Sequence, residues 1–195
     1  MQPEVAKLRA LLFDLDGTLY RQGPVRAAML RRLLAAHVVR PREGLRTLRF
    51  LAAYRRAQEE FRSAGLAGGD LAALQEEMAA TAVGLDRARA RDAVARWMER
   101  EPLDLLAPNA RPGLGELLTL ADRKGVRTGV VSDYPAAAKL AAMGLEGRFA
   151  LVVCAQDSQV AAFKPSPAGI LRALDLLGVP PEQALYVGDR PEVDG

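Results

Sequence analysis

The sequence predicts an α/β fold in which a doubly wound parallel sheet carries an inserted all-helical cap. Two observations support this fold class. From residue 112 onward, short apolar runs typical of buried strands alternate with helical patterns and short connections. Residues 21–106 instead follow a first strand and contain only helical patterns. We therefore expect residues 1–20 and 107–195 to form the sheet-containing core and residues 21–106 to form the cap.

The first expected strand carries the strongest chemical signal. An uncharged apolar run at residues 10–13 is typical of a buried strand, which we place at residues 8–15. It ends at Asp14 and Asp16, and Gly17 then allows a turn. If strand geometry continues, alternate side chains project to the same side, so the two carboxylates would face one point. Such a pair needs a bound cation or a shared proton, which favours a Mg²⁺ site or acid catalysis; an acidic turn that caps a helix is the alternative.

Four helices are expected in the cap, and none of them is separated from the next by a strand. They begin at Pro24, at Arg42, after the N-cap residue Asp70 and after the N-cap residue Asp86, and Pro41 is expected to end the first. A glycine-rich break at residues 65–69 connects the second and third helices; it is a plain connection or, if it faces a cleft, a substrate contact. His37 has no second His or Cys partner, so a packing or surface role is expected for it.

The remaining expected strands place further reactive groups beside the first. Strands are expected at residues 126–131, 150–153 and 184–187, and helices at 112–124, 136–143 and 165–177. Ser132 ends the second strand, Lys164 follows the third and Asp189 follows the fourth. Ligands of open parallel sheets bind at the carboxyl ends of the strands. We therefore expect these side chains to converge with Asp14 and Asp16, although Ser132 alone would suit a turn and Lys164 alone a surface charge.

Composition excludes several other classes of protein. Half of the 195 residues are hydrophobic and 26% are charged, a balance typical of soluble globular proteins. The net charge of +3 comes from arginines scattered among acidic residues, so a nucleic-acid partner is not expected. Cys154, the only cysteine, lies in an apolar run and is expected to be a buried, inert thiol. No signal peptide or run of about 20 apolar residues is present, so we expect a cytoplasmic protein without membrane attachment.

Four segments in this order resemble the conserved motifs of the haloacid dehalogenase superfamily, and more closely its phosphatase branch with a helical cap, the phosphoglycolate-phosphatase-like proteins. The segments are Phe13-Asp14-Leu15-Asp16-Gly17-Thr18-Leu19, Val130-Val131-Ser132-Asp133, Phe163-Lys164-Pro165-Ser166-Pro167 and Tyr186-Val187-Gly188-Asp189-Arg190-Pro191-Glu192-Val193-Asp194. They span nearly the whole chain. One such segment is a weak signal, whereas the ordered set is highly specific.

The resemblance implies a phosphoryl transfer with a role for each matching residue. Asp14 would be the nucleophile and would become an aspartyl phosphate. Asp16 would protonate the leaving alcohol and then deprotonate water, next to the transferred phosphate. Ser132 would bind a phosphate oxygen through its hydroxyl. Lys164 would bind the phosphate and neutralise Asp14.

The resemblance also implies a Mg²⁺ site. Asp14 and the main-chain carbonyl of Asp16 would be ligands, together with Asp189. Asp194 would support the same site. A divalent cation, a positive side chain and amide donors are what the spreading negative charge of a phosphoryl transfer requires.

These expectations favour a Mg²⁺-dependent phosphatase that hydrolyses a small phosphorylated metabolite. Asp16 distinguishes this reaction from dehalogenation and phosphonate hydrolysis, because the related dehalogenases and phosphonate hydrolases lack that acid. A phosphomutase and a non-catalytic binding or regulatory protein remain as alternatives. The cap would close over the cleft, with hinges near residues 20–23 and 107–110.

The sequence ends at Gly195, directly after the fourth motif, whereas superfamily members usually continue with a helix and a further strand. The strand at residues 184–187 is then expected to lack its outer neighbour. A natural short form, a truncated chain and a tail absent from this sequence are the three alternatives. If the shortening is real, we expect a tendency to form a homodimer, because exposed apolar edges pair with another chain. We then also expect lower stability and weaker Mg²⁺ binding, because Asp189 and Asp194 lie close to the end of the chain.

Overall fold

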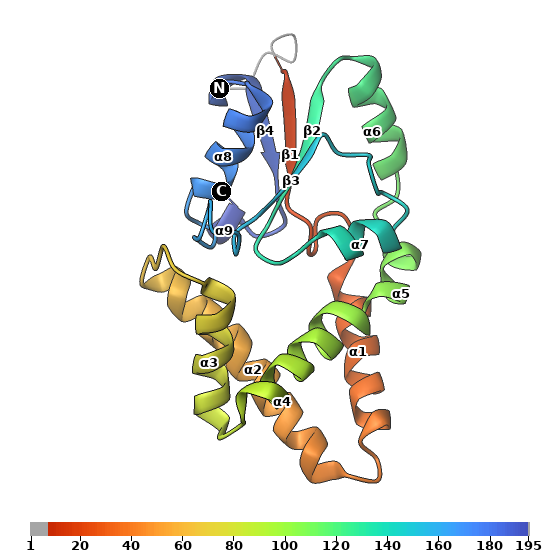
Figure 1. Ribbon diagram of the computed structural model, residues 1–195. Helices are drawn as coiled ribbons and strands as arrows, with labels where there is room; N and C mark the ends of the chain where they lie inside the picture. The colour runs from red at the N-terminus through yellow and green to blue at the C-terminus, as the bar shows by residue number, and fades with distance from the viewer. Residues whose placement is uncertain (1–7, 195) are drawn as a thin grey trace.

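The structure is a computed structural model that describes residues 8–194. A four-stranded sheet forms the centre of the core, and a helical cap lies beyond the carboxyl ends of its strands (Figure 1). The strands are β1 (Ala10–Phe13), β2 (Arg127–Ser132), β3 (Leu151–Cys154) and β4 (Ala184–Val187). All neighbouring pairs are parallel, in the order β3-β2-β1-β4. The predicted α/β fold class, with a parallel sheet and a helical insert after the first strand, is therefore confirmed.

The strand order places a crevice at the end of β1. The chain runs from β1 to β2 and β3 on one side, and then returns to β4 on the other side of β1. In open parallel sheets, the point at which the strand order reverses is where ligands bind. Gly129 lets the strands meet closely in the middle of the sheet, because a Cβ there would lie 2.9 Å from side-chain atoms of both Leu12 and Leu151.

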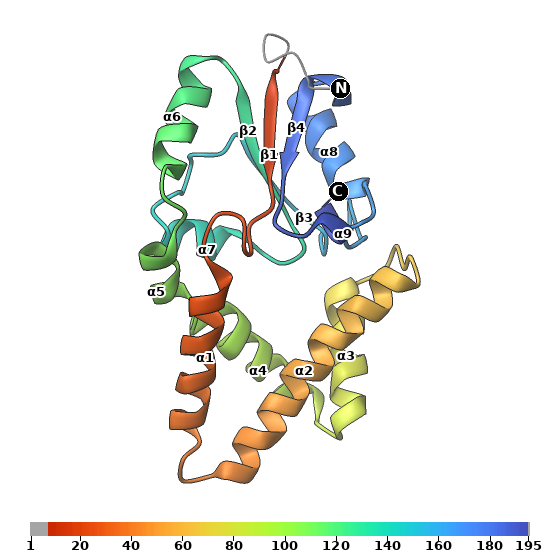
Figure 2. The same cartoon turned by 180° about the vertical axis from the view of Figure 1, so that it is seen from behind.

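Helices cover both faces of the sheet, as Figure 2 shows from behind. The bounds of these helices are α6 (Leu114–Arg123), α7 (Ala137–Ala142) and α8 (Ala168–Leu177). Phe13 and Val130 pack with Leu118 of α6 on one face, whereas Leu12 and Val131 pack with Leu174 of α8 on the other. Neighbouring strand residues thus serve opposite faces, as the alternation of side chains along a strand requires. A short helix, α9 (Pro191–Asp194), follows β4.

The cap consists of helices only. They are α1 (Gln22–Ala36), α2 (Pro41–Ser63), α3 (Leu71–Val83), α4 (Arg87–Val94) with a π-helical continuation at Ala95–Arg100, and α5 (Leu103–Leu106) followed by a 3₁₀ turn at Ala107–Asn109. Phe50 and Tyr54 of α2 pack with Ala79 of α3 and Ala90 of α4 in its small core. The ring centroid of His37 lies 5.8 Å from that of Trp97, which gives the only histidine the packing role expected of it.

The two connections between core and cap run side by side. Tyr20 and Ala110 form an isolated antiparallel bridge. The amide of Arg21 donates to the carbonyl oxygen of Asn109 at 2.8 Å, and the amide of Arg111 donates to that of Leu19 at 2.9 Å. The expected hinge segments therefore coincide with the crossings, while the hinge motion and the proposed domain limits stay predictions.

The glycine-rich break at residues 65–69 touches the core but does not line the cavity described below. Ala67 forms a bridge with Ala162, and the amide of Gly68 donates to the carbonyl oxygen of Ala161 at 2.7 Å. Among the two roles considered for this segment, the structure therefore supports a connection that docks on the loop after β3.

Several expected element limits were wrong by a few residues, for local reasons. Pro41 begins α2 at a position where its missing N–H costs nothing, and α1 already ends at Ala36. The helix expected from residue 112 begins at Leu114, because Gly113 has a left-handed φ of 80°. The strand expected at 8–15 is hydrogen-bonded as a strand only over β1.

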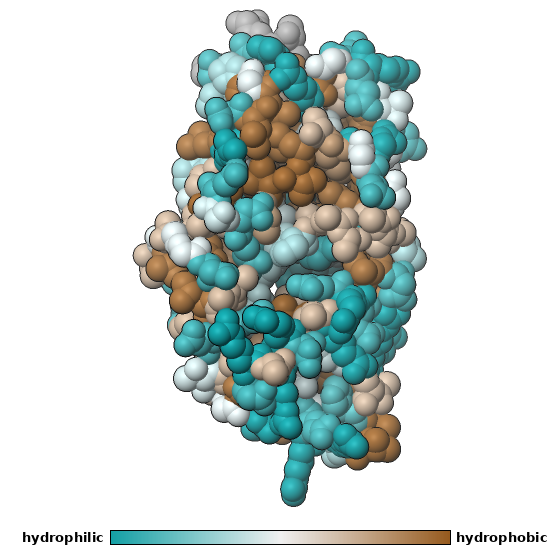
Figure 3. Space-filling model, in the orientation of Figure 1, coloured by the Kyte–Doolittle hydropathy of each residue, from teal (hydrophilic) through white to brown (hydrophobic). Residues whose placement is uncertain are grey.

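The outer strand β4 leaves apolar surface exposed. Figure 3 shows apolar side chains gathered over the strands of the core on one face of the molecule. Leu185 of β4 is 41% exposed. The homodimer expected from this edge stays a prediction that gel filtration tests. Within residues 8–194, none of the helices combines the length and the apolar character needed to cross a bilayer.

Candidate active site

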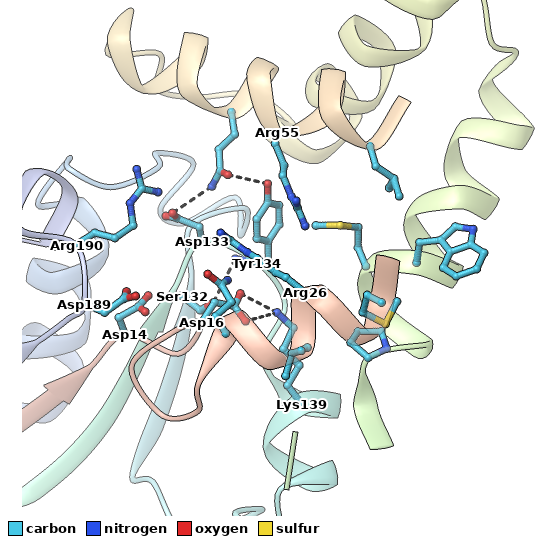
Figure 4. A pocket seen from close by; sticks show the side chains of 18 of the residues that line it. Asp14, Asp16, Arg26, Arg55, Ser132, Asp133, Tyr134, Lys139, Asp189 and Arg190 are labelled. Atoms are coloured by element: carbon cyan, nitrogen blue, oxygen red, sulfur yellow. Dashed lines mark hydrogen bonds and ion pairs between the residues drawn. The ribbon is translucent and has the colours of Figure 1, made fainter. Parts of the chain in front are cut away.

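A cavity of about 490 Å³ lies between the carboxyl ends of the strands and the cap. Its floor carries all six side chains that the sequence singled out: Asp14, Asp16, Ser132, Lys164, Asp189 and Asp194. Its walls and roof come from α1, α2 and the π-helical turn after α4 (Figure 4). The convergence expected from the strand exits is therefore observed, although the roles of these residues stay predictions.

Asp14 and Lys164 form a buried ion pair at the end of β1. The Nζ atom of Lys164 lies 2.5 Å from Oδ1 of Asp14 and 2.7 Å from Oδ1 of Asp194. It also donates to the hydroxyl oxygen of Tyr186 at 3.0 Å. Asp14 and Lys164 are 6% and 5% exposed, so the pair lies almost out of contact with water. The Thr18 hydroxyl donates to the other oxygen of Asp14 at 3.1 Å.

Burial and charge oppose each other in this pair. Burial raises the pKa of Asp14 to about 6, even though Lys164 acts to lower it. For Lys164, burial favours the neutral amine, but the carboxylate of Asp14 outweighs it and raises the pKa above its ordinary value. Lys164 therefore stays charged, and most of Asp14 is ionised at neutral pH. An ionised carboxylate with little hydration is well suited to act as a nucleophile.

Three carboxylates are arranged so that they could hold a divalent cation. Ligand oxygens of Asp14, Asp189 and Asp194 all lie within 4.8 Å of one another. Gly17 permits this approach, because it has a φ of 108° and a Cβ there would lie 2.1 Å from Oδ2 of Asp189. Hard carboxylate oxygens are the ligands that Mg²⁺ prefers, so the donor set fits the expected cofactor. Within residues 8–194, the side chain of Asp16 is not part of this group of three carboxylates.

Asp16 is instead held by groups at the cap side of the floor. The Nζ atom of Lys139 lies 2.7 Å from both of its oxygens, and the Tyr20 hydroxyl donates to Oδ1 (Figure 4). Burial acts to raise the pKa of Asp16, but Lys139 and Tyr20 outweigh it and lower the pKa below the ordinary value. Asp16 is therefore a carboxylate in this structure.

Ser132 closes β2 and is almost fully buried beside the cavity. Its Oγ accepts a hydrogen bond from the amide of Tyr134 at 3.3 Å. The hydroxyl proton remains available for an acceptor in the cavity, which is the property that the resemblance assigns to it.

Asp133, the neighbour of Ser132, connects the core to the cap. The main-chain amide of Lys164 donates to its Oδ1 at 3.1 Å. From α2, the Gln58 amide donates to Oδ2 at 3.1 Å and the Arg62 guanidinium donates to the same oxygen. The Tyr134 hydroxyl donates to Oε1 of Gln58 at 2.9 Å. The buried carboxylate of Asp133 thus binds both the main chain at Lys164 and the C-terminal end of α2.

Sequence reasoning missed Lys139 and the contacts of Asp133. Lys139 had a detectable signal, because it is the single charged residue in the otherwise apolar helix after Ser132. Arg62 and Gln58 had none, since they are two polar residues among many on a long cap helix. Their contact with Asp133 depends on how the cap is placed.

A family model for haloacid dehalogenase-like hydrolases matches residues 8–194, nearly the whole chain. The chain belongs to this family. The resemblance that the ordered motifs indicated is therefore confirmed, and the helical insert after β1 agrees with the haloacid dehalogenase-like fold. The family includes enzymes with different reactions, so its name alone does not determine the chemistry of this member.

Two relatives within the haloacid dehalogenase-like family are named phosphatases. The chain is 32% identical over 193 residues to a phosphoglycolate phosphatase of Rhodospirillum rubrum, covering 94% of this chain and 72% of the relative. It is 29% identical over 188 residues to an N-acetylmuramic acid 6-phosphate phosphatase of Pseudomonas aeruginosa, covering 94% of this chain and 74% of the relative.

Solved structures of the family share the fold. A 2-haloacid dehalogenase from Pseudomonas syringae pv. Tomato matches with a TM-score of 0.61 and 25% identity, over 96% of this chain and 80% of that chain. A magnesium-bound hydrolase of this superfamily from Bacillus subtilis matches with a TM-score of 0.63 and 16% identity, over 96% and 82% of the two chains. Both a dehalogenase and a magnesium-bound hydrolase thus share this fold.

Proposed function

We propose that this protein is a Mg²⁺-dependent phosphatase that hydrolyses a small phosphorylated metabolite through an aspartyl phosphate on Asp14. The observation that carries the proposal is the buried carboxylate of Asp14, which lies 2.5 Å from a charged lysine and beside two further carboxylates at the end of β1. The relatives support it, because their names describe the removal of phosphate from a small phosphorylated acid.

In the first step, an oxygen of Asp14 attacks the phosphorus atom and the bond from phosphorus to the ester oxygen breaks. The leaving oxygen takes a proton from Asp16, so that an alcohol departs. Lys164 and the Ser132 hydroxyl hold the phosphoryl oxygens, whose negative charge increases in the transition state. Lys139 holds Asp16 as a carboxylate in this structure. The step therefore requires that substrate binding release Asp16 from Lys139 and that Asp16 first take up a proton, from the singly protonated phosphate ester or from water.

In the second step, water attacks the same phosphorus atom and the bond to the Asp14 oxygen breaks. Asp16, which has lost its proton to the alcohol, accepts one from the attacking water. Inorganic phosphate leaves, Asp14 is again a free carboxylate, and Asp16 keeps the proton for the next turnover or loses it to water when Lys139 pairs with it again. Splitting the hydrolysis into two displacements on one carboxylate replaces one difficult step by two easier ones.

Asp14, Asp189 and Asp194 would hold Mg²⁺, together with the main-chain carbonyl of Asp16. When bound, the cation supplies positive charge that offsets the repulsion between the Asp14 carboxylate and the phosphate. The magnesium in the Bacillus subtilis relative supports this cofactor. In this structure Asp194 accepts a hydrogen bond from Lys164. We therefore expect the contribution of Asp194 to Mg²⁺ binding to depend on that lysine.

Asp16 favours phosphate-ester hydrolysis over the dehalogenation named for one structural relative. A halide leaves carbon as a stable anion and needs no proton, whereas an alkoxide leaving phosphorus does. A carboxyl group at the cavity floor, two residues after the nucleophile, can therefore act as the proton donor in phosphate-ester hydrolysis, whereas dehalogenation needs no such donor.

The first test measures phosphate release from a panel of phosphorylated acids, sugars and nucleotides, with Mg²⁺ and with EDTA. We expect release from a subset of the panel with Mg²⁺ and none with EDTA. Asp14→Asn removes the nucleophile and should lower turnover by about 10³-fold or more while the circular dichroism spectrum stays unchanged. Asp175→Asn is the matched control, because the side chain of Asp175 is 74% exposed on α8, away from the cavity, and should retain activity.

The same panel separates the alternatives. Conversion of a substrate into its phosphate isomer without free phosphate would identify a phosphomutase. No conversion of any substrate, in a protein that binds phosphorylated compounds, would identify a binding protein. Full activity of Asp14→Asn would remove the nucleophile from the proposed mechanism.

A further inference from the structure

The basic side chains that line the cavity fall into two groups. They are Arg26, Arg55, Arg62, Lys139, Lys164 and Arg190. Four of them have carboxylate partners: Arg62 pairs with Asp133, Lys139 with Asp16, Lys164 with Asp14, and Arg190 with Glu59 and Glu192. Arg26 and Arg55 make no hydrogen bond or ion pair within the part of the chain that the structure describes. Within residues 8–194, these two positive charges in the cavity therefore have no carboxylate partner.

These two arginines face each other across the cavity. Arg26 comes from α1 and Arg55 from α2, and Figure 4 shows both side chains reaching into the cavity above Asp16. The Arg55 guanidinium lies inside the cavity although the residue as a whole is exposed. Its burial there, and then the charge of Arg26, lower its pKa. Two like charges that repel each other at one cavity favour the binding of an anion between them.

Beyond the arginines, the cavity wall is apolar. Met29 and Leu33 of α1, Leu51 of α2, and Trp97 and Met98 of the π-helical turn line it. A small ligand held only at the floor would leave this wall in contact with water. The wall fits a ligand that has a hydrocarbon or ring portion next to its charged groups.

We propose that Arg26 and Arg55 form a second anion-binding subsite, so that the substrate carries its scissile phosphate at one end and a further carboxylate or phosphate at the cap end. An apolar portion of the same substrate would lie against the wall formed by α1, α2 and the π-helical turn. This inference rests on the proposed function, since it places the scissile phosphate at Asp14. It assigns selection of the substrate to two residues of the cap, whereas the chemistry belongs to the core.

The test uses three phosphonates that cannot be hydrolysed as esters: phenylphosphonate, 4-carboxyphenylphosphonate and 1,4-phenylenediphosphonate. Calorimetric titration of the full chain with Mg²⁺ present measures their binding. We expect the two compounds with a second anion to bind at least about tenfold more tightly than phenylphosphonate, because each charge-assisted contact to arginine adds roughly that factor. The ratio between them tells whether the subsite prefers a carboxylate or a phosphate.

The arginines are tested by Arg26→Met, Arg55→Met and the double variant, which keep much of the length of the side chain without its charge. We expect the preference for a second anion to shrink in each single variant and to vanish in the double variant, while the affinity for phenylphosphonate changes less than about twofold. Arg56→Met is the matched control: Arg56 follows Arg55 on α2 but is exposed and does not line the cavity. It should keep the full preference.

Equal binding of all three compounds by the wild-type protein would overturn the inference, and so would a preference that survives in the double variant. The outcome is separable from the proposed catalysis. A preference that depends on the arginines, in a protein that releases phosphate from no ester, would support the subsite and contradict the phosphatase. Phosphate release without any such preference would support the phosphatase and contradict the subsite.

Discussion

In the proposed mechanism, Asp16 serves two steps that need opposite protonation states. The structure holds it as a carboxylate through Lys139 and Tyr20, which suits the acceptance of a proton from water. Donation of a proton to the leaving alcohol requires that the contacts of Lys139 with Asp16 be broken. A substrate phosphate offers Lys139 other negative oxygens within the same cavity, so that substrate binding itself can free Asp16. In this mechanism Lys139 holds Asp16 before substrate binds and contacts the phosphate afterwards.

Cys154 gives a residue-scale prediction outside the reaction. Burial raises the pKa of its thiol to about 11, so at pH 8 roughly one molecule in a thousand carries the reactive thiolate. We expect Ellman's reagent at pH 8 to react at least about 100-fold more slowly with the folded protein than with protein in urea. The rate for the folded protein should rise with pH towards 11. Rapid, complete reaction of the folded protein at pH 8 would contradict the burial of this thiol.

The sequence was most informative at residues that a strand positions. Asp14, Ser132, Lys164 and Asp189 were found because parallel strands bring their carboxyl ends to one edge, and this rule needs no knowledge of side-chain packing. The ion pair of Lys139 with Asp16 was missed for the opposite reason. It depends on the path of the loop and the turn of the helix after β2, which no spacing rule encodes.

At the scale of elements, helix caps were the most predictable features. Asp70 and Asp86 accept hydrogen bonds from the amides three residues later, both at 3.0 Å, as N-cap residues should. Gly84 ends α3 with a left-handed φ of 62°. Helix starts marked by proline were less predictable, because the same residue can end one helix or begin the next. Pro41, which the sequence predicts to end the first cap helix, is the first residue of α2.

Asp70 provides a stability prediction for α3. Its side chain accepts from the amide of Ala73, and the next residue, Leu71, is fully buried against Ala155 and Phe163 of the core. Asp70→Ala leaves an amide of the first turn without its acceptor and should lower the free energy of unfolding by about 1 kcal/mol. Asp70→Asn keeps a capping oxygen and should change it far less. Urea denaturation of both variants measures the difference; equal losses would show that the cap is not what stabilises the start of α3.

At the scale of the whole molecule, the position of the cap was beyond sequence reasoning. The core and the helical insert each follow from their own hydrophobic patterns. Their relative placement depends on contacts between residues far apart in the sequence, both polar, such as Arg62 with Asp133, and apolar, such as Leu71 with Phe163. The pattern of apolar residues does not identify such partners. The cavity roof, with Arg26 and Arg55, was therefore visible only in the structure.

The Arg62–Asp133 pair should stabilise the arrangement of cap and core seen in this structure. The two side chains are 7% and 9% exposed, and Arg62→Met leaves the buried carboxylate with only the Gln58 and Lys164 N–H donors. We expect a loss of about 2–3 kcal/mol in the free energy of unfolding, less than for a buried charge left without any donor. Hydrogen exchange should also quicken at the segment around residue 163. Arg56→Met should change neither quantity, and unchanged exchange in Arg62→Met would show that this pair does not hold the cap.

The proposed mechanism requires that a phosphoryl group pass through the carboxylate of Asp14. The most direct measurement is chemical capture: the protein is mixed with Mg²⁺ and a hydrolysed phosphate ester, quenched in acid during turnover and reduced with borohydride, which converts an acyl phosphate to an alcohol. Peptide mass spectrometry then locates the reduced residue. We predict homoserine at position 14, and none in a sample prepared without substrate. Continuous phosphate release with an unmodified Asp14, or with the reduced residue at another position, would rule out Asp14 as the nucleophile.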